Sequence, residues 1–263
     1  EGNLTFTDGV YYIDSAVEYV GSANISWSAN AFLKFGSGGS LKISGQLQSL
    51  GKLSANTNKN QKTISLINAD SVKPDDLLCI FNPTNNSFAS MSDRPYYKAG
   101  EMIRAATVSG NTVTTYGKLI DDYLATDVDV YKIYGSRVSL KNPKIIAEQD
   151  TPYPVTISLA DGVLVERYHN IGGKYAGIKF DRCYNTEMVA PSARNNSANN
   201  NLNYGVLILN CQSFSVDGGD PAAARHAIAM GGSNETCCVP TRFVRISNAT
   251  LATSNNTIGA ADA

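Results

Sequence analysis

Short runs in which apolar and polar residues alternate fill most of the chain. In the first 50 residues they include Val10–Ile13, Ile25–Trp27, Ala31–Phe35 and Leu41–Ile43, and glycine and serine lie between them. Runs of this length, rich in β-branched and aromatic residues, are typical of strands and too short for helices. We therefore expect residues 1–50 to form opening strands and the first coils of a β structure.

Residues 51–134 have a different sequence pattern, which we interpret as a compact antiparallel module. Thr63–Ile67 is a strand-like run, and Met102–Val108 and Thr112–Tyr116 flank the turn sequence Ser109–Asn111. A Gly-Asn turn between two alternating runs predicts a β-hairpin. This module is expected to be an insertion near the N-terminal end of the fold.

Residues 135–263 contain five segments with one pattern: apolar, any residue, apolar, any residue, polar, small. The segments are Val138–Pro143, Ile157–Gly162, Ile178–Cys183, Val206–Cys211 and Val244–Ala249. Their polar positions are Asn142, Asp161, Arg182, Asn210 and Asn248. A unit that recurs at intervals of about 20 residues or more is typical of a solenoid.

This repeat predicts a parallel β-helix, in which each coil pairs its short strands with the coils above and below. The polar position would be a bend, because asparagine tolerates the left-handed backbone conformation that a tight bend requires. An antiparallel sandwich is the alternative, although it predicts no repeated bend. The predicted fold class is all-β, a right-handed parallel β-helix with a small antiparallel insertion.

Composition and charge argue against several classes of function. The chain has 263 residues with 22 basic and 23 acidic side chains, so the net charge is −1. Near-neutrality argues against binding to nucleic acid, and the sequence has no apolar run long enough to cross a membrane. Five cysteines, no CxxC motif and only two histidines make a structural zinc site improbable, so we expect no metal and no cofactor.

Because the sequence begins without Met and stops in a polar stretch, we expect it to be a fragment whose coils continue beyond Ala263.

Three stretches together resemble bacteriophage tailspikes of the right-handed parallel β-helix, pectate-lyase-like superfamily. The first is Gly9–Ile13, which is similar to the start of such a β-helix. The second resembles the small β insertion near the start of many tailspike bodies, and it comprises Tyr96–Glu101, Val108–Val113 and Asp121–Tyr123. The third resembles the run from one coil to the next, and it comprises Arg225–Ile228, Gly231–Gly232, Val244–Leu251 and Gly259–Asp262.

This resemblance implies a homotrimeric fibre of the phage tail, in the virion and acting at the outer surface of the host. It implies binding to a bacterial surface polysaccharide, either capsule or lipopolysaccharide O-antigen, and usually its cleavage. Other tail or baseplate proteins would attach through an N-terminal region that is missing here. The relatives share no single catalytic motif, so no catalytic residue is transferred from them.

A glycosidase requires two carboxyl groups, one that donates a proton and one that acts as nucleophile or base. The carboxylates in the second half of the chain supply the candidates, which are Asp217, Glu187, Asp181 and Asp220, with Glu166 as a further one. Asp181 should face outward if Ile178 and Phe180 face inward. The sequence Asp220-Pro221 is also typical of a helix start, which gives Asp220 a structural alternative.

Sugar binding uses aromatic faces and polar side chains. Tyr184 and Tyr204 border residues 187–204, which we expect to form an extended loop, and Arg194 within it could meet an anionic sugar. Three functions remain open: a hydrolase of bacterial polysaccharide, a non-catalytic receptor-binding fibre of the same fold, and a polysaccharide lyase.

Overall fold

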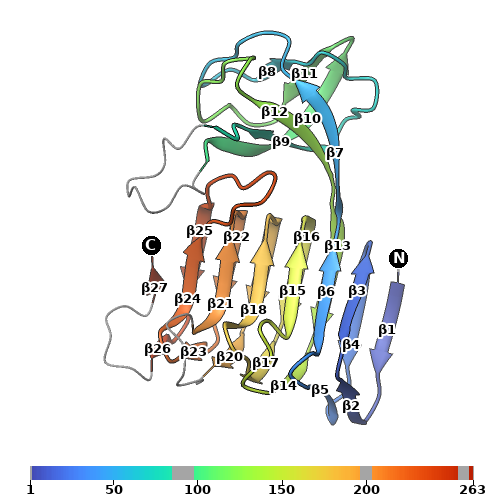
Figure 1. Ribbon diagram of the computed structural model, residues 1–263, viewed down its shortest axis with the longest axis vertical. Coiled ribbons are helices and arrows are strands. Elements are labelled where there is room, and N and C mark those ends of the chain that lie inside the picture. Colours follow the sequence, from blue (N-terminus) through green and yellow to red (C-terminus); the bar gives the residue numbers. More distant parts are fainter. Residues whose placement is uncertain (1, 85–97, 196–202, 254–260, 263) are drawn as a thin grey trace. The chain divides into compact units, whose positions relative to one another are not determined.

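The computed structural model describes residues 2–84, 98–195, 203–253 and 261–262. Every regular element in these ranges is a strand, which confirms the all-β prediction (Figure 1). The chain divides into two compact units, and each is described by itself. One unit comprises Glu1–Gly45, Ser136–Gly231 and Thr241–Ala263, and the other comprises Gln46–Gly135 and Gly232–Pro240.

The first unit is a right-handed parallel β-helix, as predicted. Each coil contributes one strand to each of three seven-stranded parallel sheets, here called sheets A, B and C (Figure 1). Sheet A consists of β1 (Gly2–Phe6), β4 (Ala23–Trp27), β13 (Ser136–Lys141), β16 (Ala160–Glu166), β19 (Tyr184–Val189), β22 (Gln212–Asp217) and β25 (Arg242–Ser247). Sheet B consists of β2 (Gly9–Ile13), β5 (Ala31–Phe35), β14 (Lys144–Ala147), β17 (His169–Gly172), β20 (Ser192–Asn195), β23 (Ala222–Ala223) and β26 (Ala252–Thr253). Sheet C consists of β3 (Ala16–Val20), β6 (Ser40–Ser44), β15 (Val155–Ser158), β18 (Ala176–Asp181), β21 (Tyr204–Leu209), β24 (His226–Gly231) and β27 (Ala261–Asp262).

The second unit contains the predicted antiparallel insertion, which leaves the β-helix after β6 and returns at β13. Its six strands pair in the order β7-β12-β9-β10-β11-β8, and every pair is antiparallel. The strands are β7 (Gln46–Lys52), β8 (Thr63–Ser65), β9 (Leu77–Phe81), β10 (Gly100–Ser109), β11 (Thr112–Thr115) and β12 (Asp129–Tyr134). The turn between β10 and β11 is the hairpin that Gly110-Asn111 predicts.

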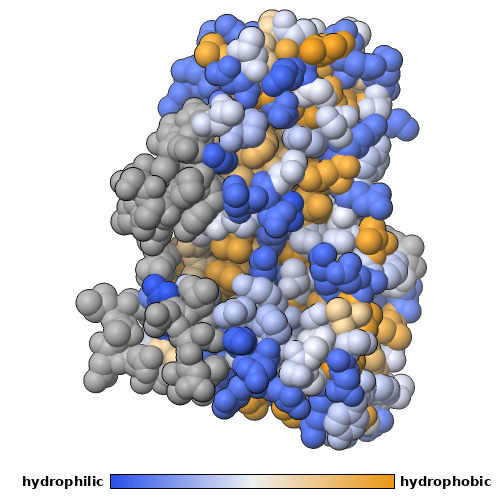
Figure 2. Space-filling model, viewed as in Figure 1, coloured by the Kyte–Doolittle hydropathy of each residue, from blue (hydrophilic) through white to orange (hydrophobic). Residues whose placement is uncertain are grey.

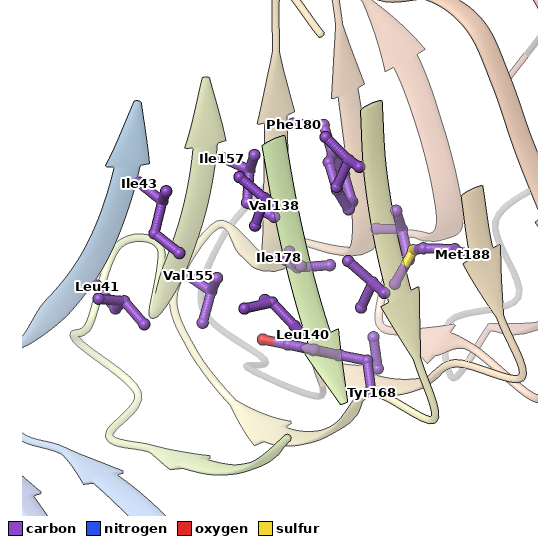
Figure 3. Packing of buried hydrophobic residues seen from close by; sticks show 14 of the residues in the cluster. Leu41, Ile43, Val138, Leu140, Val155, Ile157, Tyr168, Ile178, Phe180 and Met188 are labelled. Atoms are coloured by element: carbon purple, nitrogen blue, oxygen red, sulfur yellow. The ribbon is translucent and has the colours of Figure 1, made fainter. Parts of the chain in front are cut away.

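The core of the β-helix is built from inward-facing residues of all three sheets. Figure 3 shows Ile157 and Phe180 of sheet C pointing toward Val138 of sheet A, and each of these side chains is at most 2% exposed. The rings of Phe180 and Phe214 meet edge to face with centroids 4.9 Å apart. Burying one side chain of this size stabilises the fold by about 1.5–3 kcal/mol, so the stacked coils depend on this alternation.

The coils bend at two corners where the backbone is left-handed. At the corner after sheet A, the residues with positive φ are Asn142, Arg167, Ala190, Gly218 and Asn248. At the corner after sheet C, they are Leu159, Arg182 and Asn210. Each of these corner residues lies next to its counterpart in the neighbouring coil. The backbone NH of Asn142, for example, donates a hydrogen bond to the Glu166 carbonyl at 2.9 Å.

The structure therefore corrects the single bend column that the sequence suggested. Asn142 and Asn248 lie at one corner, Arg182 and Asn210 lie at the other, and Asp161 lies inside β16, so Leu159 takes its place. Both corners follow a strand with two inward apolar residues, so two strands of each coil carry the same local pattern. The Ile157 segment was also aligned two residues out of register, because Ile157 pairs with Phe180 and not with Ile178.

Candidate functional site

Several of the candidate residues lie on the outer face of sheet A, where they alternate with buried residues. On β19, Asn185 and Glu187 are exposed, whereas Thr186 and Met188 are buried in the coil. The same alternation on β22 turns Ser215 and Asp217 outward. Because the strands are parallel and in register, these side chains form rows that run from coil to coil.

The carboxylates of Glu166, Glu187 and Asp217 lie on this face near Val189. Val189 on β19 pairs directly with Glu166 on β16 and with Asp217 on β22. Glu187 lies two residues before Val189 and points to the same side, opposite Leu164 and Ser215. The structure thus brings two of the predicted catalytic carboxylates, Glu187 and Asp217, onto adjacent coils of one face, together with Glu166.

Asp217 is held as an ionised carboxylate. Its Oδ1 accepts hydrogen bonds from Ser247 Oγ and Asn248 Nδ2, both at 2.8 Å. These two bonds, together with the positive charge of Arg245, lower the pKa of Asp217 below its ordinary value. A group that stays ionised is suited to act as a base or nucleophile and unsuited to donate a proton.

Next to these carboxylates the surface is hollowed. A depression of about 430 Å³ crosses the outer face of sheet A, and Glu187 lies in its wall. Its other outward-facing lining residues include Asn24, Ser139, Asn185 and the exposed guanidinium of Arg137. Gly162 leaves space here because it has no side chain. A hollow lined by amide, hydroxyl and charged groups suits a ligand with many hydroxyl groups.

The other two predicted catalytic carboxylates lie elsewhere and are engaged in ion pairs. Asp181 is on the outer side of sheet C, where its Oδ2 lies 3.0 Å from Arg182 Nη2 and its side chain is only 5% exposed. Asp220 follows sheet A in the turn to β23 and pairs with Arg194 of sheet B. The sequence Asp220-Pro221 leads into the two-residue strand β23, whereas its alternative interpretation as a helix start is wrong.

The three predicted sugar-binding residues are not brought together. Tyr184 begins β19 on sheet A, Arg194 is on sheet B, and Tyr204 is on sheet C. Tyr204 stacks on His226 with ring centroids 5.7 Å apart, and its hydroxyl lies 3.3 Å from Arg225 Nη1. Within the predicted extended loop 187–204, residues 187–189 end β19 and residues 192–195 form β20, whereas residues 196–202 lie outside the described residues.

Sequence reasoning missed Arg137, Phe243 and Arg245, which also face outward from sheet A. No local motif marks them, because they come from strands over 100 residues apart. The strand alternation of Arg242–Ser247 could have placed Phe243 and Arg245 opposite to Val244 and Ile246. The register that sets Arg245 near Asp217 appears only in the folded coils.

We find no grouping of three or more His, Cys, Asp or Glu side chains suited to a metal ion among the described residues. Within the same residues, no helix has the length and hydrophobicity to span a bilayer. On the side of the molecule that Figure 2 shows, hydrophilic and hydrophobic side chains are intermixed.

Two family models match the chain. One, described as Gp49, pectin lyase-like, matches residues 171–263, and the other, described as tailspike protein-like, Ig-like domain, matches residues 42–133. A comparison with curated proteins finds no match.

Solved structures of phage tailspikes are similar to this chain over nearly its whole length. The Gp54 tailspike of Acinetobacter baumannii bacteriophage AP22 is 31% identical, with a TM-score of 0.88 over 97% of this chain. The gp61 tailspike of Pseudomonas phage phi297 is 31% identical, with a TM-score of 0.83 over 95% of this chain. The gp49 tailspike of Pseudomonas phage LKA1 is 27% identical, with a TM-score of 0.82 over 95% of this chain. This chain spans 42% of the length of each of these three proteins.

The order of elements in the β-helix, the antiparallel insertion after its second coil, and these similarities agree. The chain belongs to the phage tailspikes that have a pectin lyase-like β-helix and an Ig-like domain.

Proposed function

We propose that the outer face of sheet A binds a bacterial surface polysaccharide, either capsule or O-antigen, and hydrolyses its glycosidic bonds. The observation that carries this proposal is the position of Glu187 and Asp217 on one face of adjacent coils, beside a depression lined by both polar and apolar groups. The AP22 tailspike was solved in complex with an A. baumannii capsular saccharide, which supports the substrate class.

Each carboxylate has a distinct role in this proposal. Asp217 stays ionised and activates the attacking water as a base, because its two hydrogen bonds stabilise the charged form. Glu187 lies in the wall of the depression and donates the proton to the leaving oxygen. Glu166 is a further candidate for the base or the proton donor, since it lies on the same outer face of sheet A. Asp181 and Asp220 are assigned structural roles through their ion pairs.

The register of the strands supports inversion of the anomeric centre. No two of Glu166, Glu187 and Asp217 stand directly opposite on neighbouring strands. Glu187 and Asp217 are diagonal neighbours, so the strand spacing and rise put their Cα atoms roughly 8 Å apart, and their side chains can extend from there with a water molecule between the carboxyl groups. Inverting glycosidases hold their carboxyl groups about 6.5–9.5 Å apart, which leaves room for a water molecule, whereas retaining ones need about 5 Å.

Two other functions remain as alternatives. A non-catalytic receptor-binding fibre would use the same depression to hold the glycan and leave it intact. A polysaccharide lyase would need a cationic or neutral base on this face, and Arg137, Lys141 and Arg245 are the exposed cations that sheet A offers. Hydrolysis is preferred because three carboxylates share the face.

Assembly and location belong to the same proposal. A trimeric tail fibre in the virion needs an apolar surface between subunits, and sheet B exposes one. Tyr12, Ile146 and Ile171 lie in one row of its outer face, which also contains Lys34 and Arg194, and the three apolar side chains are 69%, 37% and 51% exposed. We assign this row to the interface between copies of the chain. Attachment to other tail or baseplate proteins is assigned to parts of the protein outside this chain.

Release of reducing ends from purified capsular polysaccharides and lipopolysaccharides by the full-length protein tests the activity. Glu187→Gln and Asp217→Asn should each reduce kcat by a factor of about 100 or more and leave polysaccharide binding measurable. Asp150→Asn is the matched control, because that side chain is 79% exposed and lies between β14 of sheet B and β15 of sheet C. Full activity in both site variants would refute the assignment, an unsaturated product that absorbs ultraviolet light would favour the lyase, and binding without cleavage by the unaltered protein would favour the fibre.

A further inference from the structure

Phe243 is an exposed aromatic residue in a backbone conformation that disfavours it. It lies on the outer face of β25, its φ is 57°, and it is 68% exposed. Every coil of sheet A from β16 onward has one left-handed residue at this place, and the preceding ones are Gly162, Asn185 and Ser213. Those residues are small or polar and tolerate positive φ, whereas a bulky aromatic residue does so at a cost in free energy.

The ring of Phe243 points away from the core, and β25 is the last strand of sheet A among the described residues, so its exposure is that of an edge strand. Val244 and Ile246 on the same strand pack against the core, whereas Phe243 exposes two thirds of its surface. An outward aromatic ring in a strained backbone conformation is a candidate for contact with a ligand.

The neighbour of Phe243 on its own strand is a cation, and the proposed catalytic carboxylates lie further along the same face on the two preceding coils. Arg245 lies two residues further along β25, points to the same side and is exposed. It pairs directly with Ser215 on β22, which in turn pairs with Glu187 on β19. Asp217 lies at the end of β22 on this face, so the four side chains occupy three consecutive coils.

An aromatic ring beside an arginine has a definite ligand chemistry. The ring can stack on the apolar face of a pyranose, and the planar guanidinium can hold a carboxylate through two parallel hydrogen bonds. We propose that Phe243 and Arg245 form a subsite for an acidic sugar residue of the polysaccharide, next to the bond that Glu187 and Asp217 cleave. This inference rests on the proposed function and adds the charge of the sugar that the site selects.

The experiment compares one polysaccharide with its own uncharged form. A panel of acidic and neutral capsular polysaccharides identifies those that the unaltered full-length protein binds, and the carboxyl groups of an acidic one are then reduced to alcohols. We expect carboxyl reduction to weaken binding by the unaltered protein about tenfold or more. We expect Arg245→Gln to weaken binding of the acidic form to a similar extent and to have little effect on the reduced form.

Phe243→Asn separates a binding role from a structural one. Asparagine tolerates positive φ, so we expect the melting temperature to stay the same or rise, while affinity for both forms of the polysaccharide falls about tenfold. Phe243→Tyr should retain the affinity. Lys42→Gln is the control for loss of a positive charge, because Lys42 lies on sheet C and pairs with Glu18.

The outcomes separate this inference from the proposal beneath it. If the unaltered protein binds no member of the panel, the proposed function fails and the subsite fails with it. If it binds only neutral polysaccharides, or if both variants bind the acidic form normally, the subsite is refuted while the proposed function stands. A lower melting temperature or altered oligomeric state in Phe243→Asn would show that the ring is structural and would overturn the inference.

Discussion

Asn248 donates a 2.8 Å hydrogen bond from its side-chain amide to the carboxylate of Asp217 on the preceding coil. Asn248 is itself at the corner after sheet A, with a φ of 55°. One residue of the bend therefore also holds a candidate catalytic group. This hydrogen bond therefore connects the bend of the coil with the proposed catalytic carboxylate.

Ser247→Ala should raise the pKa of Asp217, because it removes one of the two donors that stabilise the ionised form. If Asp217 is the base, the acid limb of kcat/KM lies below the ordinary pKa of an aspartate and moves to higher pH in this variant. The two hydrogen bonds also add stability at pH values above the ordinary pKa, and this contribution disappears as pH falls through the lowered one. A pH–rate profile measures the shift.

Ser215→Ala is the matched control for that profile, because Ser215 faces outward from the same strand and its hydroxyl contacts the Thr186 carbonyl instead. An acid limb that stays in place in Ser247→Ala would show that Asp217 does not set the pH dependence.

The first product of cleavage should carry the inverted anomeric configuration. The diagonal arrangement of Glu187 and Asp217 leaves space for water between the carboxylates. Proton NMR of the reducing end, recorded before mutarotation, measures the configuration. Retention of configuration would assign the chemistry to a closer pair of groups than this one.

Asp181→Asn should destabilise the β-helix by about 3 kcal/mol, because it leaves the guanidinium of Arg182 without its carboxylate in a nearly buried position. Asp220→Asn breaks an ion pair whose side chains are 44% and 48% exposed, so its effect should be below about 1 kcal/mol. Thermal unfolding compares the two. Both variants should keep the activity of the folded protein, and loss of turnover in either at a temperature where it is fully folded would return that residue to the catalytic candidates.

Ala190→Gly should stabilise the protein slightly. Ala190 has a φ of 49° at the corner after sheet A, where glycine avoids a penalty of about 1–2 kcal/mol but loses part of that gain through the greater freedom of the unfolded chain. We expect a net gain of roughly 0.5 kcal/mol in the free energy of unfolding, measured by chemical denaturation. Ala193→Gly, at a buried position on the neighbouring strand of sheet B, is the control and should be destabilising.

Ile171→Asp should weaken association between copies of the chain, because it replaces an exposed apolar side chain on sheet B with a charged one. Light scattering of the full-length protein measures the molar mass. Glu166→Gln, on the outer face of sheet A, should leave the molar mass unchanged. A trimer that persists unaltered in Ile171→Asp would place the interface on another face.

Much of the fold could be predicted because it depends on local regularities. Alternation in runs such as Ile178–Asp181 determines which side chains enter the core, and asparagines that tolerate positive φ, such as Asn142, Asn210 and Asn248, mark several of the bends. These features lie within a few neighbouring residues, so they are visible in the sequence. The antiparallel insertion was predictable for the same reason, since the turn at Gly110-Asn111 and its flanking runs are local.

Only the tertiary structure decided which residues share a face. The two corners of each coil carry the same local pattern, so the sequence could not assign Asn142 and Arg182 to different corners. A shift of one or two positions between coils changes the neighbour of every outward side chain. The pairing of Val189 with Asp217, the ion pair between Arg194 and Asp220, and the position of Arg245 opposite Ser215 therefore follow from the register between coils. That register is set by how the buried side chains of successive coils stack, which is a property of the folded solenoid and of no single segment.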